Sequence, residues 1–425
     1  MNNQFTYNQI TYNLSNITGF LDLIKTGRII PNYETLKTDH STYYSYQQYY
    51  DELNKDYTIV KYKKEFLRPD LINTYGLLRS VIFTGQKVLS FSPPKSLSAE
   101  NFMSLYPTKN ENIIAQEFIE GTMINVFFDS TCEEGKCWKI ATRNTVGANV
   151  SFYKDSGMTF NEMFMDACVY NNFDIQLLNP LFCYSFVLQH PVNRIVVPFN
   201  KPQLYIVGIY QIIQSNESII VSEHNLSQIQ QIGLFNTTKL KFPEIYDFSA
   251  YTELIEKFAS GNTPYSVMGV VVKNTMTGER TKFRNPIYEE IRQLRGNQPK
   301  LQYQYLCLRQ SGKLPEYLKY YPETKKDMST YRDQLHMFTE NLHKNYISCY
   351  IQKTQKLGLF PAQYRTHMFK LHEHFINDLR PQNLYITKIE VINYVNKLHP
   401  SLLMYCLNYN IRKHSIDTNS NSIPN

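Results

Sequence analysis

The chain has 425 residues, of which 42% are apolar and 19% are charged. This length and composition suffice for a folded core in two or three domains, and they exclude intrinsic disorder over most of the chain. The longest apolar stretch is much shorter than the roughly 20 residues that a membrane helix needs, and the N-terminus lacks the basic and apolar segments of a signal peptide. We therefore expect an intracellular protein that is not secreted and has no membrane partner, with its seven Cys as free thiols.

The first part of the chain is predicted to be rich in strands. Residues 1–55 are rich in Asn, Thr and Tyr and carry no catalytic motif, so we interpret them as an N-terminal extension. Over residues 56–289, short runs of Val, Ile, Phe and Tyr alternate with turns, and the short links favour antiparallel pairing. The runs that predict strands are 80–83, 87–91, 123–128, 138–142, 194–197, 204–210 and 267–272.

The last third of the chain has a different pattern. Its apolar spacing is helical, most clearly over 331–352, 367–379 and 389–398, so we expect an all-helical domain over 290–414 and a disordered tail over 415–425. The predicted fold class is therefore α+β, with a domain of antiparallel sheets flanked by helices before the helical domain.

Positive charge is concentrated in the same last third. From Glu290 onward there are 19 Lys and Arg against 10 Asp and Glu, whereas the preceding part has 25 against 27. A basic segment that is also rich in Tyr and His suits contacts to the phosphates and bases of a nucleic acid. A solvated helical surface would have the same composition, so charge alone leaves both interpretations open.

Four segments of the strand-rich part carry the functional signal. In chain order they are Glu117–Thr122, Pro191–Val197, Met268–Lys273 and Lys282–Pro286. Their order and spacing resemble the collinear motifs of the covalent nucleotidyltransferases, the superfamily of ATP-dependent RNA and DNA ligases and mRNA capping enzymes. They most resemble the phage-type RNA ligases and ligase-like proteins of large DNA viruses, which implies a nucleotidyltransferase (ATP-grasp-like) domain. A viral source would place the protein in the host cytoplasm or in the virion.

The resemblance also shows which catalytic groups are missing. In this family a Lys attacks the α-phosphate of ATP, while Mg²⁺ and basic side chains neutralise the developing charge. The resemblance places Phe118 at the nucleophile position, where a phenyl ring forms no phosphoramidate. It places Val187 and Met268 where acids hold the metal or orient the ligand, and neither supplies the oxygen that Mg²⁺ requires. We therefore predict a catalytically degenerate protein, for which ATP and Mg²⁺ are cofactors only if it is active.

Several other residues match positions that the resemblance assigns to nucleotide binding. They are Glu120, Gly121, Arg143, Arg194, Lys273, Lys282 and Arg284. Arg79 and Lys95 fall where RNA ligases have a basic segment, so we expect them to bind RNA or a terminal phosphate. Each retained residue also has a structural interpretation, such as a surface ion pair between Glu120 and Arg143. No spacing of His, Cys, Asp or Glu is typical of a metal site.

Three functions remain open on the sequence. The first, which we favour, is a degenerate RNA ligase-like protein that binds RNA or nucleotide in a ligase-type cleft. The second is an active ATP-dependent RNA ligase or guanylyltransferase that uses a displaced nucleophile, with Lys95, Lys139 and Lys273 as candidates. The third is a structural or virion assembly protein that reuses the fold and binds a protein partner.

Overall fold

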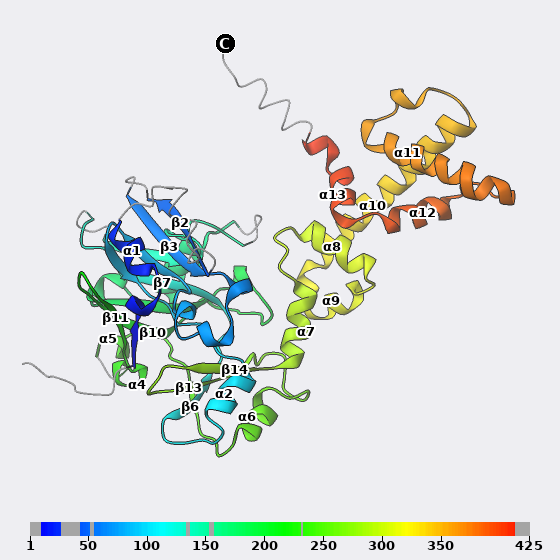
Figure 1. The fold of residues 1–425 in the computed structure, drawn as a ribbon. Helices are drawn as coiled ribbons and strands as arrows, with labels where there is room; N and C mark the ends of the chain where they lie inside the picture. Colours follow the sequence, from blue (N-terminus) through cyan, green and yellow to red (C-terminus); the bar gives the residue numbers. More distant parts are fainter. Residues whose placement is uncertain are drawn as a thin grey trace, which may run out of the picture. The chain divides into compact units, whose positions relative to one another are not determined.

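The computed structural model describes residues 10–26, 43–51, 55–132, 137–152, 157–230 and 233–412. The chain forms two compact units, Met1–Glu290 and Ile291–Asn425. All the described strands lie in unit 1, whereas the described part of unit 2 is helical (Figure 1). The architecture is therefore α+β, as the sequence predicts. The predicted tail over 415–425 lies outside the described residues.

Unit 1 is built on three antiparallel sheets among its described residues. The six-stranded sheet has the order β1 (Ile10–Asn13), β11 (Ile219–Glu223), β10 (Gln203–Gln214), β9 (Phe182–Gln189), β7 (Thr122–Phe128), β8 (Trp138–Thr142). The first four-stranded sheet has the order β12 (Ile245–Tyr246), β6 (Ile113–Glu117), β13 (Gly269–Asn274), β14 (Arg280–Arg284). The second has the order β2 (Tyr44–Tyr50), β3 (Asp56–Tyr62), β4 (Val81–Thr84), β5 (Lys87–Ser90). Strands β1 and β2, from the segment interpreted as an extension, pair with later strands of unit 1.

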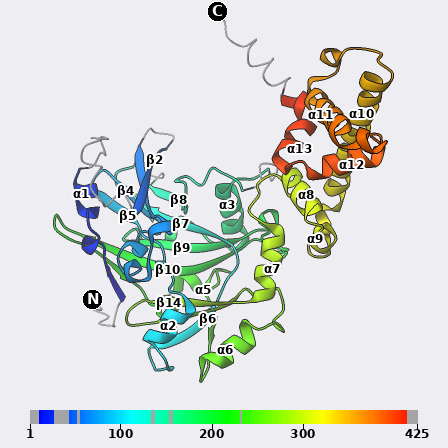
Figure 2. The same ribbon diagram turned by 45° about the vertical axis from the view of Figure 1, so that its right-hand side comes forward.

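Helices cover the apolar faces of these sheets. Helix α3 (Phe160–Tyr170) packs Met163 and Phe164 against buried residues of β9 and β10. Helices α2 (Ala99–Leu105) and α6 (Tyr251–Phe258) lie against one face of β6, β13 and β14 (Figure 2). The remaining helices of unit 1 are α1 (Phe20–Lys25), α4 (Leu226–Ile229), α5 (Gly233–Asn236) and α7 (Pro286–Arg295), which continues into unit 2.

After α7, the described part of unit 2 contains six α-helices, three of which correspond to the predicted stretches 331–352, 367–379 and 389–398. The six helices are α8 (Leu301–Gln310), α9 (Leu314–Tyr320), α10 (Lys325–Tyr346), α11 (Ala362–His374), α12 (Lys388–Lys397) and α13 (Pro400–Leu407). A π-helical segment extends α10 over Ile347–Ile351 and another extends α11 over Phe375–Leu379. Within the described part of the chain, no helix is long and apolar enough to cross a membrane.

The strand predictions are confirmed except for one. The predicted runs correspond to β4, β5, β7, β8, β10 and β13, but residues 194–197 form no strand, and the chain bends at residues 195–197. The backbone N–H groups of Val196 and Val197 donate to the carboxylate of Glu120, at 2.8 and 3.1 Å, instead of to a neighbouring strand. The carboxylate of Glu120, far away in the sequence, therefore accepts the hydrogen bonds that a neighbouring strand would otherwise accept. The local sequence pattern does not reveal this acceptor. The seven cysteines are free thiols, as predicted.

Candidate functional site

Strand β14 presents a basic stripe on one face of its sheet. Successive side chains of a strand point to opposite faces. Thr281 and Phe283 are buried toward α2 and α6, so Arg280, Lys282 and Arg284 lie on the opposite face. The register with β13 places Lys282 beside Val271 and Arg280 beside Lys273. Three cations therefore follow one another at two-residue spacing on the face that α2 and α6 leave uncovered.

Phe118, which follows β6 directly, lies against this stripe. The Nζ of Lys282 is 4.3 Å from the centre of the Phe118 ring, and the guanidinium carbon of Arg284 is 5.3 Å from it. The negative π face of an aromatic ring attracts cations and offsets part of their repulsion. At the position predicted for a nucleophile, the chain therefore holds a ring in contact with two cations.

Arg79 and Lys95 join the stripe from other parts of the chain. Burial lowers the pKa of Lys282 well below its ordinary value, and the charges of Arg280, Arg79, Arg284 and Lys95 lower it further. Burial likewise lowers the pKa of Arg79 to about 10, with Arg280 and Arg143 adding to the effect. Burial, then Arg79, lowers the pKa of Lys95. Because these groups act on one another, we call Arg79, Lys95, Arg280, Lys282 and Arg284 the cationic cluster.

Backbone carbonyl groups, rather than carboxylates, hold most of the cationic cluster. Arg79 donates to the carbonyl oxygen of Pro93 at 3.3 Å, Arg280 to that of Pro94 at 2.7 Å, and Lys95 to that of Ser96 at 2.8 Å. The Nε of Arg280 is buried and has no hydrogen-bond partner.

Among the described residues, Arg284 is the one member of the cluster in an ion pair, with Glu289 at 2.7 Å. Partly buried charge without counter-charge is costly. The cluster therefore favours an anion such as a phosphate.

A pocket of about 1020 Å³ adjoins the cluster. Residues of β6, β13 and β14 line one side of it, and residues of β10, β11 and α4 line another. Arg280 belongs to both the pocket lining and the cationic cluster. Lys273 also lines the pocket, where its Nζ forms a 2.6 Å ion pair with Glu223, which accepts a 2.7 Å hydrogen bond from Tyr12. Unlike the cationic cluster, this cation already has a protein counter-charge.

The segment around Glu120 has a structural role in the free protein. Glu120 is 5% exposed, and its carboxylate accepts the hydrogen bonds from Val196 and Val197. Burial raises the pKa of Glu120, while those hydrogen bonds and the charge of Arg194 oppose the rise. At Gly121, with φ of +151°, a Cβ atom would come within 2.5 Å of the carbonyl oxygen of Leu188. The structure thus brings these predicted residues together around the 194–197 segment.

The positions of the missing acids do not fit a divalent cation. Val187 is buried in an apolar group with Ile119 and Tyr205. Met268 lies just before β13, where its carbonyl oxygen accepts a hydrogen bond from the backbone of Asn285. Within the described residues, no three His, Cys, Asp or Glu side chains form a group that could hold a metal. Neither position therefore offers the oxygen ligands that Mg²⁺ prefers.

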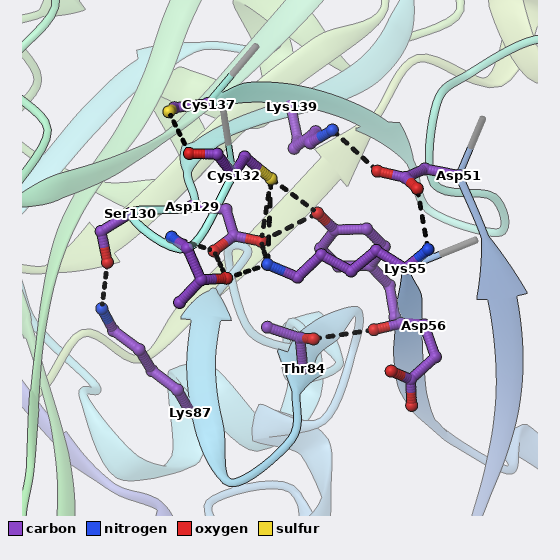
Figure 3. Close-up of polar contacts among 12 residues, drawn as sticks. Asp51, Lys55, Asp56, Thr84, Lys87, Asp129, Ser130, Cys132, Cys137 and Lys139 are labelled. Carbon is purple, nitrogen blue, oxygen red and sulfur yellow. Dashed lines mark hydrogen bonds and ion pairs between the residues drawn. The ribbon is translucent and has the colours of Figure 1, made fainter. Parts of the chain in front are cut away.

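The remaining candidates lie in other surroundings. Arg143 stacks over the ring of Tyr62 at 5.4 Å, and its charge acts on Arg79. Lys139 forms a 2.9 Å ion pair with Asp51, beside the buried pair of Lys55 and Asp129 (Figure 3). Sequence reasoning missed Arg280, although the Arg280–Lys282–Arg284 spacing is a signal of one basic strand face.

The chain has distant relatives among known proteins. It is 25% identical over 264 residues to a protein named RNA ligase from Rhodothermus phage RM378, and the match covers 54% of each chain. It is also 25% identical over 332 residues to a protein named immediate-early protein ICP-46 homolog from Invertebrate iridescent virus 6, covering 71% of this chain and 68% of that one. The chain thus spans about half the length of the phage relative. No protein-family model matches it.

Solved structures of ligases resemble the chain only weakly. An RNA ligase of Naegleria gruberi aligns with 47% of this chain and 57% of its own length, at 12% identity and a TM-score of 0.33. An archaeal ATP-dependent RNA ligase aligns with 92% of this chain and 79% of its own length, at 11% identity and a TM-score of 0.36. The sequence similarity makes the chain a distant homologue of a phage RNA ligase, as the motifs predict.

Proposed function

We propose that this chain is an RNA ligase-like protein that binds the phosphates of RNA or nucleotide at the cationic cluster and forms no covalent link to a nucleotide. The observation that carries the proposal is the contact of Phe118 with Lys282 and Arg284. The phosphate-binding charges are retained there, whereas the position of the attacking amine holds a ring.

The geometry of β14 suits a chain of phosphates. Residues on one face of a strand are separated by about 6.6 Å, so Arg280, Lys282 and Arg284 present charges at regular intervals. Guanidinium groups bind phosphate oxygens through two parallel hydrogen bonds, and an ammonium group binds them as a point charge. Burial is the main cause of the lowered pKa of Lys282, and a bound anion would offset the charges of the neighbouring cations that lower it further. RNA is favoured over other polyanions because the phage relative is named an RNA ligase.

A second candidate function has one observation in its favour. A desolvated Lys next to other cations loses its proton readily and becomes nucleophilic. Lys95 is in such surroundings, whereas Lys139 and Lys273, the other predicted substitutes, are held in ion pairs with Asp51 and Glu223. An active nucleotidyltransferase would therefore use Lys95, or Lys282 beside Phe118, rather than those two residues.

Salt dependence of RNA binding tests the proposal. The anisotropy of a fluorescein-labelled RNA is measured with the full chain between about 50 and 200 mM salt, where each phosphate contact to a single strand contributes about −0.7 to the slope of log K against log salt. We expect a slope of about −2 for three contacts. Arg280→Gln should weaken binding and reduce the slope by about one contact, whereas Arg332→Gln, at an exposed ion pair in α10, should change neither. Absent or salt-independent binding would contradict the proposal and favour an assembly role.

A further inference from the structure

Unit 2 contains a row of aromatic rings that ends in solvent. The rings of Tyr350 and His372 stack at 3.9 Å between centres with an interplanar angle of 13°. His372 stacks on Phe375 at 5.9 Å and 27°, and Phe375 on Tyr385 at 6.4 Å and 20°. We call these four residues the aromatic row. They come from the end of α10, from α11 and its extension, and from the loop before α12.

The row begins in the core and becomes exposed along its length. Tyr346, which packs beside Tyr350 and His372, is 1% exposed, whereas Tyr385 at the other end is 71% exposed. The row thus connects a buried ring to an exposed one through near-parallel rings. The solvent-facing side of Tyr385 is therefore accessible to one more planar group.

The backbone departs from regular helix at two members of the row. Tyr350 lies in the π-helical segment Ile347–Ile351, and Phe375 begins the π-helical segment Phe375–Leu379. These are the π-helical segments of the described chain, and each carries a ring of the row. Such segments are rare in proteins, and they are frequently found at functional sites.

Charge around the row matches a polyanion. Residues 344–388 contain seven Lys and Arg and two Asp and Glu, and two further acids, Glu340 and Glu390, flank this range. One of the two acids, Asp378, is paired with His374 at 2.7 Å. Aromatic platforms within positive surroundings bind single-stranded nucleic acids, because the bases stack on rings while cations contact the phosphates.

We propose that the aromatic row is a stacking platform for the unpaired bases of a single-stranded RNA, with Tyr385 as the residue on which a base stacks. The proposal does not depend on the cationic cluster, because the row lies wholly in unit 2. It assigns the exposed apolar surface beside the row, which includes Leu384 and Ile389, to RNA rather than to a protein.

Substitutions at Tyr385 separate stacking from apolar contact. The full chain is titrated against fluorescein-labelled oligoadenylate and against an RNA duplex of the same length. Tyr385→Leu should lower the affinity for oligoadenylate about tenfold and leave duplex binding unchanged, whereas Tyr385→Phe should bind like the unsubstituted chain. The slope against salt should stay the same in Tyr385→Leu, because the substitution removes no charge.

Two controls separate base stacking on Tyr385 from other effects on RNA affinity. Tyr405, 44% exposed on α13 and outside the row, supplies the matched substitution Tyr405→Leu, which should leave RNA affinity unchanged. The same comparison in an Arg280→Gln background should keep the tenfold loss for Tyr385→Leu, which separates the platform from the cluster. The proposal would be overturned by unchanged affinity of Tyr385→Leu, by equal losses in Tyr385→Phe or Tyr405→Leu, or by a change of oligomeric state without a change in RNA affinity.

Discussion

The Nζ atom of Lys282 lies 4.3 Å from the centre of the Phe118 ring. Phe118 stands where the motifs predict an attacking amine, and Lys282 stands where they predict a phosphate ligand. The ring offsets part of the repulsion among cations that have few protein counter-charges. A site of this kind stabilises a bound anion and offers no amine at the expected position.

Replacing the ring should not restore chemistry. We expect Phe118→Lys to form no covalent link to a nucleotide, because Val187 and Met268 still offer no oxygen for a metal. It should also lower the free energy of unfolding by about 1–2 kcal/mol, since a contact with two cations becomes a repulsion. Urea unfolding and a label-transfer assay measure the two effects, with Phe118→Tyr as the control that keeps the ring. Label transfer by Phe118→Lys alone would show that a metal site is present.

Removing a cation from the cluster should stabilise the free protein. The pKa of Lys282 is lowered by folding, so the unfolded chain binds more protons between that lowered pKa and the ordinary value, and stability rises with pH over this window. Lys282→Met should therefore unfold at higher urea concentration than the unsubstituted chain near neutral pH. The difference should shrink as pH rises toward the ordinary Lys value.

Tripolyphosphate should make the unsubstituted chain more stable than Lys282→Met, which is the reverse of their order without the anion. A ligand at 100 times its Kd stabilises a folded protein by about 2.7 kcal/mol, so saturating anion should favour the unsubstituted chain over Lys282→Met. Lys344→Met, at an exposed ion pair in unit 2, should respond to the anion as the unsubstituted chain does. If tripolyphosphate stabilised Lys282→Met as much as it stabilises the unsubstituted chain, the anion would bind at another site.

The buried carboxylate of Asp129 should make the free energy of unfolding depend on pH in the acidic range. Burial alone would raise the pKa of Asp129, but the ion pair with Lys55 at 2.5 Å and hydrogen bonds from Thr131 and Tyr57 lower it below its ordinary value (Figure 3). The stabilisation is therefore fully present above about pH 4, and it is lost as pH falls toward the lowered pKa.

Asp129→Asn tests this dependence. We expect it to cost about 3 kcal/mol near neutral pH, because breaking a buried pair leaves a charge without its partner, and to cost progressively less below about pH 4. Asp70→Asn is the matched control, since Asp70 and Arg68 form a surface pair with 62% and 68% exposed side chains and should contribute less than about 1 kcal/mol. A constant difference between Asp129→Asn and the unsubstituted chain across this pH range would refute the assignment.

Features that depend on local interactions could be predicted from the sequence, whereas features that depend on contacts between distant residues could not. The strands β7, β8, β10 and β13 follow from short local runs of apolar residues, most of which are buried in the folded chain. The bends at residues 195–197 do not follow from the local pattern, because Glu120, more than 70 residues earlier, supplies the hydrogen-bond acceptor. Motif order assigned Phe118 and Lys282 to one predicted site, and the structure adds that the two side chains are in contact. Arg280 belongs to no motif and joins the cluster through the pairing of β13 with β14.

That long-range acceptor gives a further prediction. Glu120→Ala should lower the free energy of unfolding by about 1–3 kcal/mol, because it leaves the N–H groups of Val196 and Val197 without an acceptor. Glu120→Gln should cost less, since an amide oxygen still accepts and burial already disfavours the charge. Glu256→Ala, on the exposed side of α6, is the control and should change stability by no more than about 0.5 kcal/mol. Urea unfolding measures all three, and equal stability of Glu120→Ala and Glu256→Ala would contradict the structural role.

Label transfer is the most direct test of the central claim. The chain is incubated with Mg²⁺ or Mn²⁺ and α-labelled ATP or GTP, and protein-bound label is measured after denaturation, in the same preparation that is titrated with RNA. We predict salt-sensitive RNA binding with no label on the protein. Label that survives denaturation and maps to Lys95 or Lys282 would contradict the claim and show that a displaced amine performs the family reaction.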